Sequence, residues 1–279
     1  MTRHPAPVAR KGREPRAERW ILTGAALLFL AFFLAVPLAV VFGNAFGGGL
    51  AAYVAAISEP YALSAVRLTI VISLLVVPCN VLFGIAAAWT VAKFDFRGRN
   101  LLVTLIDVPF AVSPVISGML FVLLFGARGI FGPWLADHDV KILFALPGMA
   151  LATAFVSAPL VARQLIPLMR SQGSEEELAA MTLGASGFQM FRRVSLPKMR
   201  WGLLYGVILC NARAMGEFGA VSVVSGHVRG RTTTLPLHVE ILYNEYQFQA
   251  AFAAASLLTL LALVTLALQA FLERRGTGV

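Results

Sequence analysis

LTIVISLLVVPCNVLFGIAAAWTVA, residues 68–92, is a stretch of 25 residues without a charged side chain. A helix rises about 1.5 Å per residue, so roughly 20 apolar residues cross a bilayer core about 30 Å thick. The stretch therefore predicts a membrane-spanning helix. The rest of the chain agrees, because 58% of its 279 residues are hydrophobic and only 13% are charged. Soluble domains carry about a quarter charged residues, so an ordinary soluble protein is excluded.

Hydropathy along the whole chain predicts an all-α fold with six transmembrane helices. The expected spans are residues 20–42, 68–92, 101–125, 142–168, 201–224 and 249–272. The fifth span is the weakest because it contains Arg213 and Glu217. The first span follows a basic leader, but its apolar run is too long for a signal peptide, so we expect an uncleaved anchor. The expected organisation is a disordered basic tail (1–19), a transmembrane domain (20–272) and a short C-terminal tail (273–279).

Basic residues are distributed unevenly on the two sides of these six spans. Sixteen lie on the side of the N-terminus, and five lie on the other side: Arg67, Arg128, Lys141, Arg229 and Arg231. Cytoplasmic loops carry the excess of lysine and arginine in membrane proteins. Both termini are therefore predicted to be cytoplasmic, and the net charge of +9 is attributed to orientation at a lipid membrane rather than to nucleic-acid binding.

The cytoplasmic loop over residues 170–200 carries signals for two short helices. S-E-E-E at 174–177 and S-G-F-Q at 186–189 both fit the capping box that starts a helix. Gly184 can adopt the left-handed conformation that ends the first helix, and Pro197 is expected to interrupt the pattern before the next span. Leu178, Met181 and Thr182 share one face, as do Phe188 and Phe191. The loop thus either docks on a cytoplasmic partner or lies against the bilayer, and a DNA-reading helix-turn-helix is improbable between two spans.

The same loop resembles the EAA loop of bacterial ABC importer permeases. That pattern is E-A-A, three residues, Gly, nine residues, Ile, one residue and Leu-Pro, and Leu178 stands here where the pattern has its acidic residue, with Glu177 one position earlier. The resemblance implies the type I importer (MetI-like) fold and a loop that couples the spans to an ATP-binding subunit. The residues it assigns to coupling are Glu177, Leu178, Ala179, Ala180, Gly184, Phe188, Val194, Leu196 and Pro197.

Two further stretches are similar to the sulfate/thiosulfate permeases within that family: residues 107–118, and residues 211–227 followed by 235–246. This resemblance implies a bacterial inner-membrane subunit that works with a second sulfate permease subunit, two ATP-binding subunits and an extracytoplasmic sulfate-binding protein. The main alternative is the same architecture carrying molybdate or another oxyanion, and a secondary transporter is the less favoured one. The chain has no Gly-Lys dipeptide and therefore no P-loop. ATP and Mg²⁺ are expected to bind the partner subunits, and this chain is expected to have no cofactor and no catalytic residue.

Two sets of polar residues inside spans are candidates for the pathway or gate. Ser113, Pro114 and Ser117 offer hydroxyls and a bend in the third span, although small residues also simply pack helices. Arg213 and Glu217 lie one turn apart near the middle of the fifth span, where an ion pair that locks helices competes with direct contact to a passing anion.

The remaining polar residues are expected to be structural. Arg163 should extend toward the membrane surface, and Gly202 and Gly206 should pack helices. The run of threonines at 232–234 is either a contact for the binding protein or a solvated turn. His138, His227 and His238 have no metal-ligand spacing, and Cys79 and Cys210 lie in apolar stretches, so no metal site or disulfide framework is expected. A polytopic enzyme would need a cluster of His, Asp or Glu at one membrane face, which the sequence lacks.

Overall fold

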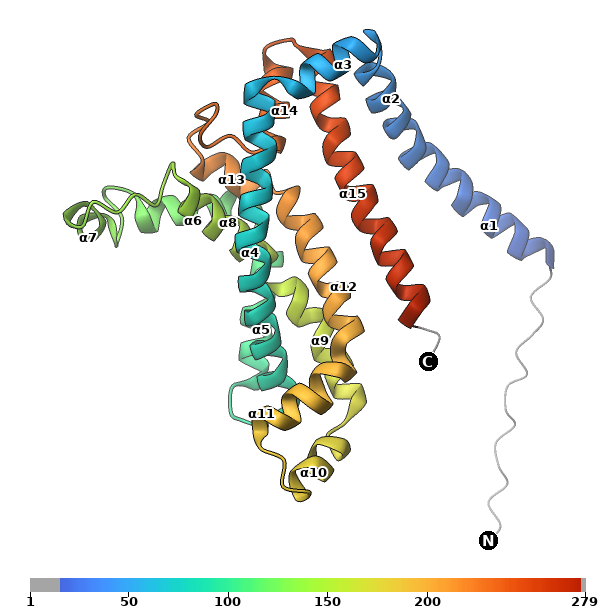
Figure 1. Cartoon of the computed structure of the whole chain (residues 1–279), viewed down its shortest axis with the longest axis vertical. Helices are drawn as coiled ribbons and strands as arrows, with labels where there is room; N and C mark the ends of the chain where they lie inside the picture. The colour runs from blue at the N-terminus through green and yellow to red at the C-terminus, as the bar shows by residue number, and fades with distance from the viewer. Residues whose placement is uncertain (1–15, 277–279) are drawn as a thin grey trace.

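The computed structural model describes residues 16–276, and every element in that range is helical (Figure 1). The predicted all-α class is confirmed. Residues 1–15 and 277–279 of the two expected tails lie outside the described residues. Helix α1 (Arg16–Leu30) includes the last four residues of the expected N-terminal tail, and α15 (Phe248–Gly276) continues past residue 272.

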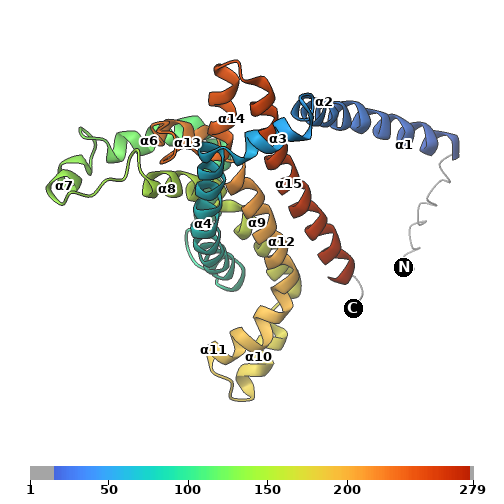
Figure 2. The same ribbon diagram turned by 45° about the horizontal axis from the view of Figure 1, so that its top comes forward.

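The first hydrophobic run stands apart from the other helices. It consists of α1, a π-helical turn η1 (Ala31–Ala35) and α2 (Val36–Ala45), and Figures 1 and 2 show it leaving the bundle as an arm. None of its most apolar window is buried, and Trp20 and Phe33 are 76% and 62% exposed. Such a large apolar surface requires lipid or another chain to cover it.

Within residues 16–276, four helices are long and apolar enough to cross a membrane, or five if a bent pair is one span. The four are Trp20–Ala45, Pro60–Lys93, Leu146–Gln172 and Phe248–Thr265. The fifth predicted span lies largely in α12 (Leu196–Met215), in which every window of 18 residues contains Lys198, Arg200 and Arg213. Because of these three charged residues, α12 is not among the four apolar helices, so the count of six spans stays a prediction.

The third predicted span is broken. Helices α5 (Arg99–Ala111) and α6 (Pro114–Phe125) meet at an angle of 105° instead of forming one rod over residues 101–125. Val112 and Ser113 are extended, with ψ of 133° and 137°. For Ser113 the cause is Pro114, because a proline ring disfavours helical geometry in the residue before it. The fifth predicted span is also interrupted, at residues 216–218, between α12 and α13 (Gly219–Val224).

Helix α4 (Pro60–Lys93) is the central element of the bundle (Figure 1). Its first half shares one apolar core with α8 (Leu146–Ser157), α12, α13 and α14 (Leu235–Asn244). Its second half shares another core with α5, α9 (Pro159–Gln172) and α12. Glycine permits this close packing, since a Cβ on Gly206 would lie 3.2 Å from Val161 Cα and one on Gly202 would lie 2.4 Å from Leu168 Cδ2. The predicted packing role of these two glycines is confirmed.

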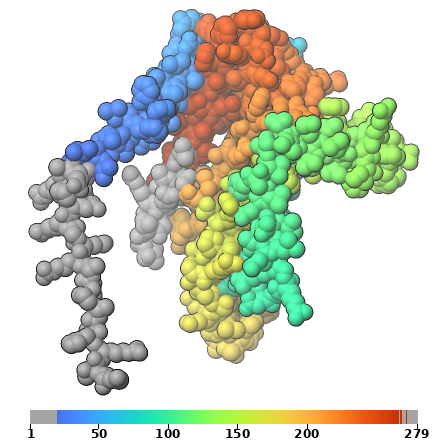
Figure 3. All heavy atoms as spheres, turned by 180° about the vertical axis from the view of Figure 1, so that it is seen from behind, coloured from blue at the N-terminus to red at the C-terminus, as the bar shows by residue number. Residues whose placement is uncertain are grey.

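The two ends of α4 carry different elements. At its C-terminal end lie α10 (Glu175–Thr182), α11 (Gly187–Met190) and the π-helical turn η2 (Phe191–Ser195). At its N-terminal end lie α3 (Gly49–Ser58) and α14 (Figures 1 and 2). Helix α6 and the short α7 (Gly132–Asp137) extend sideways as a second arm, which Figure 3 shows from behind.

Candidate functional site

The loop at the C-terminal end of α4 folds as two short helices joined by a glycine turn. Gly184 has φ of +86°, in the left-handed region, and a Cβ there would meet nothing within 4 Å. Ser186 then caps α11: its hydroxyl accepts from the Gln189 amide, and the Gln189 side chain accepts from the Ser186 amide. The predicted glycine turn and second capping box are confirmed.

The predicted first capping box is wrong. Ser174 occupies the N-cap of α10, but its side chain makes no capping hydrogen bond. Glu177, the other member of the expected box, turns away from the Ser174 amide and pairs with Lys93 of α4. With Lys93 both partners of the Glu177 carboxylate contact are charged, whereas a backbone amide is a neutral donor. Packing of α10 beside α4 therefore overrides the local signal.

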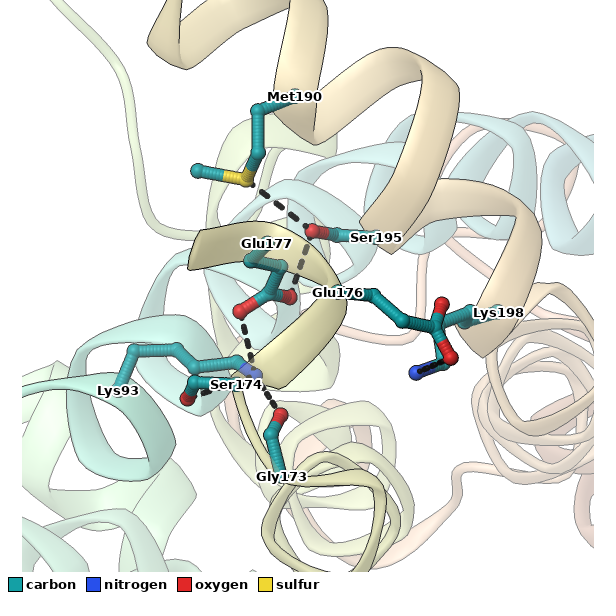
Figure 4. A network of polar contacts seen from close by, with 8 residues as sticks. All are labelled: Lys93, Gly173, Ser174, Glu176, Glu177, Met190, Ser195 and Lys198. Atoms are coloured by element: carbon teal, nitrogen blue, oxygen red, sulfur yellow. Dashed lines mark hydrogen bonds and ion pairs between the residues drawn. The ribbon is translucent and has the colours of Figure 1, made fainter. Parts of the chain in front are cut away.

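Glu177 is the centre of a buried polar network, drawn in Figure 4. Its Oε2 lies 2.7 Å from Lys93 Nζ, and its Oε1 accepts a hydrogen bond of 2.7 Å from Ser195 Oγ. The Lys93 and Glu177 side chains are only 9% and 11% exposed. Lys93 Nζ also donates to the Gly173 carbonyl at 2.5 Å. One ion pair thus joins α4, the start of α10 and the last residue of η2, directly before α12.

A second ion pair on the same loop lies at the surface. Lys198 Nζ of α12 lies 2.8 Å from Glu176 Oε1 of α10, with side chains 28% and 63% exposed. The Lys198 carbonyl accepts from Gln172 Nε2 at 3.0 Å. Exposed pairs contribute little to stability, so the buried pair is the stronger attachment of α10.

Part of the exposed surface of α10, α11 and the turn between them is apolar. Leu178, Leu183 and Phe188 are 56%, 89% and 72% exposed. Phe191, predicted to share a face with Phe188, instead packs edge-on against Trp89 of α4, with ring centroids 5.4 Å apart. A groove of about 900 Å³ separates α10 and α11 from this part of α4. The exposed apolar side chains form a surface suited to contact with another protein.

The other predicted coupling residues surround this surface. Ala179 is exposed, and Ala180, Val194 and Leu196 are half-buried. The predicted interruption of the helical pattern at Pro197 is wrong. Pro197 lies in the first turn of α12, and the helical run from α11 through η2 to α12 is continuous. The wider π-helical turn precedes the proline, and such turns accommodate residues that would disrupt a regular helix.

The predicted pair in the fifth span is present. Arg213 Nη1 lies 2.6 Å from Glu217 Oε2, and the side chains are 37% and 1% exposed. Glu217 Oε1 also accepts from the Ala220 amide at 2.9 Å, near the start of α13. The carboxylate therefore holds the break between α12 and α13, and the predicted ion pair is confirmed.

The break in the third span lies against this second break. A Cβ on Gly118 would lie 2.7 Å from the Ala220 carbonyl oxygen, and one on Gly219 would lie 2.9 Å from Pro114 Cβ. Ser113 is exposed at the bend, whereas Ser117 is buried and donates to the Ser113 carbonyl at 3.2 Å. The structure thus brings all five predicted pathway residues to two adjacent helix breaks.

Three further side-chain placements differ from, or add to, the sequence prediction. Arg163 does not extend freely to the surface, since its Nε donates to Asp107 Oδ1 at 2.8 Å and its guanidinium lies 4.6 Å from the Phe110 ring centroid. The threonines at 232–234 are buried, so both expectations for them, a solvated turn and a contact for the binding protein, are wrong. The sequence analysis did not identify Lys93, whose only sequence signal is its position at the end of a charge-free run.

Among residues 16–276, no group of three or more His, Cys, Asp or Glu could hold a metal ion.

Comparison with known proteins agrees with these features. Residues 80–277 match the family model described as binding-protein-dependent transport system inner membrane component. The sulfate transport system permease protein CysW of Escherichia coli K12 is 52% identical over 92% of this chain and 88% of its own. CysW of Synechocystis is 50% identical over 92% of this chain and 93% of its own.

A solved bacterial alginate ABC transporter, in complex with an alginate-bound periplasmic protein, has a similar fold. Its TM-score is 0.76 at 19% identity, and the match covers 95% of this chain and 98% of the other. The identity is low, so this likeness concerns the fold alone. The family model and the CysW relatives together show that the chain belongs to the binding-protein-dependent transport system inner membrane components.

Proposed function

We propose that this chain is a permease subunit of an ATP-driven importer that moves sulfate, and thiosulfate with it, across the bacterial inner membrane. The observation that carries the substrate is the 52% identity to a CysW sulfate permease over 92% of the chain. The CysT sulfate permease of Escherichia coli is more distant, at 34% identity, and is the model for the second permease subunit. Molybdate and other oxyanions are the alternative cargo.

The proposed link to ATP hydrolysis is the apolar surface of α10 and α11. This surface would sit in a groove of an ATP-binding subunit, which would hold ATP and Mg²⁺ and hydrolyse the nucleotide. The exposed Leu178, Leu183 and Phe188 would lose their contact with water there, which favours docking. This chain would contribute no catalytic residue and no cofactor site of its own.

Movement of the docked loop would reach the spans through Glu177. Its carboxylate contacts Lys93 of α4 on one side and Ser195, directly before α12, on the other. Each nucleotide state of the partner would then favour one arrangement of α4 and α12. The adjacent breaks, with Ser113, Pro114 and Ser117 beside Arg213 and Glu217, are the proposed gate.

The proposed assembly contains a second permease subunit, two ATP-binding subunits and an extracytoplasmic sulfate-binding protein. The apolar arm of α1 and α2 would lie in lipid or against the second permease. Both termini and the α10–α11 loop would be cytoplasmic, as the positive-inside rule requires. A reporter active only outside the cytoplasm should therefore give signal when fused after Gly132 and none after Gly98, and the reverse would overturn this orientation.

The transport proposal is tested in proteoliposomes that contain the whole complex, with ATP enclosed and with sulfate and the binding protein outside. We expect uptake of radioactive sulfate that needs ATP, the binding protein and both kinds of permease subunit. Competition by unlabelled thiosulfate and molybdate identifies the preferred oxyanion. Sulfate uptake without the ATP-binding subunits, driven by a proton gradient, would instead support a secondary transporter.

A further inference from the structure

Arg67 and Arg231 line a single cavity at the end of α4 remote from the coupling loop. The cavity has a volume of about 520 Å³, and Ser64, Leu68 and Leu146 form part of its wall. Arg67 lies in the second turn of α4, and Arg231 lies in the loop between α13 and α14. Both are exposed. Over residues 16–276, neither guanidinium makes an ion pair or a hydrogen bond.

None of the residues that line the cavity is acidic. Glu245 pairs with Arg229, and Glu240 lies 3.5 Å from His227. Glu59 precedes α4 by one residue and does not line the cavity. Two cations therefore face one cavity without a protein anion to neutralise them. Like charges placed together repel, and a bound anion removes that repulsion.

The loop that carries Arg231 is held firmly against α4. The amide of Leu235 donates to Thr69 Oγ1 at 2.8 Å, two residues beyond Arg67 on α4. Within the loop, Arg231 and Thr232 amides both donate to the Val228 carbonyl, and the Val228 amide donates to Thr232 Oγ1. These bonds fix the backbone of Arg231 relative to Arg67, so the two side chains start from a prepared geometry.

We propose that Arg67 and Arg231 form a binding site for a free tetrahedral oxyanion at the outer mouth of the transport path. The planar fork of an arginine donates two parallel hydrogen bonds to oxyanions such as sulfate, and two forks match a dianion with four acceptor oxygens. The site deepens the proposed function and rests on it for the identity of the anion.

Binding is tested on the full chain alone in nanodiscs, without any transport partner. Ser64→Cys, in a Cys79→Ala background, places a thiol in the cavity wall. An anionic methanethiosulfonate reagent should label it at least about tenfold faster than a cationic one, because paired cations concentrate anions. Millimolar sodium sulfate should slow the labelling more than sodium gluconate at equal ionic strength. Arg67→Gln with Arg231→Gln should remove both effects, whereas Arg128→Gln, another arginine predicted outside, should keep them.

Equal protection by sulfate and gluconate would overturn the site. So would protection that survives in the double variant. Lipid headgroups carry the same tetrahedral chemistry, so the measurement is repeated with zwitterionic and with anionic lipid. Protection that disappears in anionic lipid would assign the site to a headgroup and overturn the proposal.

The role in transport is tested in the whole complex. The double Gln variant should lower sulfate uptake at least about fivefold relative to Arg128→Gln, while ATP hydrolysis stimulated by the loaded binding protein stays at the parent rate. Arg67→Lys with Arg231→Lys should recover part of the uptake. A parallel loss of stimulated hydrolysis would mean that the arginines dock the binding protein, and unchanged uptake would remove them from the path; either result overturns the proposal. If the parent complex moves no sulfate while sulfate still protects Ser64→Cys, the proposed function fails and the site stands.

Discussion

Helix α4 carries one cation near each end, and the two differ in exposure and in whether a carboxylate pairs with them. Lys93 is 9% exposed and lies 2.7 Å from the Glu177 carboxylate. Arg67, 26 residues earlier and so roughly 39 Å away along the helix, is exposed and lines a cavity with a second arginine. A charge with a buried partner holds helices together, whereas charges left without one are available to a ligand. The two ends of α4 thus serve attachment and anion binding respectively.

Lys93→Met gives the largest effect expected, because it leaves the Glu177 carboxylate buried and unpaired. Breaking a buried ion pair from one side costs about 3–5 kcal/mol. The purified variant should unfold at a clearly lower temperature and lose ATP-dependent uptake. Lys93→Met with Glu177→Met removes both charges and should recover most of the stability. A double variant as unstable as the single one would show that the pair does not act as a unit.

The pair at the helix break offers a second case of a buried carboxylate. Arg213→Leu strands Glu217, whose side chain is 1% exposed, at a cost of about 3 kcal/mol on insertion scales. Folded yield should fall for Arg213→Leu and for Glu217→Leu, and should fall less for the two together. Equal losses in all three variants would indicate that the residues act separately and that Arg213 serves the anion directly.

Gly184→Val changes the shape of the α10–α11 loop but keeps the ion pair that attaches α10 to α4. A branched side chain at φ of +86° is strained by about 1–2 kcal/mol, whereas Asn tolerates this conformation. Gly184→Val should insert normally, lose uptake and retain less ATP-binding subunit on co-purification, while Gly184→Asn should behave like the parent. Parent-level uptake and co-purification in the valine variant would favour a loop that only lies against the bilayer.

The smallest effect belongs to the surface pair. Lys198→Met breaks a contact to Glu176, whose side chain is 63% exposed, and such pairs contribute at most about 1 kcal/mol. The thermal midpoint and uptake should stay close to those of the parent. A loss comparable to that of Lys93→Met would erase the distinction between buried and exposed attachment of α10.

Local features of this protein were predictable from sequence because their causes lie within a few residues. Gly184 ends α10 and the 186–189 box starts α11 as their residue types require. Arg213 and Glu217 pair because they are only four residues apart, although Glu217 lies in the break after α12 and not on the helix itself. The 16-to-5 distribution of basic residues likewise predicts an orientation, which the structure leaves to experiment.

Features that depend on packing between distant segments were not predictable. Lys93 and Glu177 are 84 residues apart, so nothing local signals that Glu177 abandons the Ser174 capping box. Apolar composition also concealed the bend at residues 112–113, because a hydropathy window does not distinguish a straight helix from two helices meeting at 105°. The threonines at 232–234 are buried although their residue type suggests an exposed turn, and the next residue, Leu235, donates its amide to Thr69 Oγ1 of the distant α4.

The central claim is that α10 and the end of α4 move as one body during transport. Lys93→Cys with Glu177→Cys, in a chain with Cys79→Ala and Cys210→Ala, allows a short bifunctional thiol reagent to replace the ion pair by a covalent link. The reagent is a bis-methanethiosulfonate, which joins the two thiols through disulfides and releases methanesulfinate, so that a reductant can cleave the link. In vesicles with the whole complex, we predict that cross-linking restores ATP-dependent sulfate uptake toward the parent rate and raises it above that of the untreated double variant. Uptake that is abolished by the link and returns when a reductant cleaves it would show that α10 must move relative to α4, and would contradict the account.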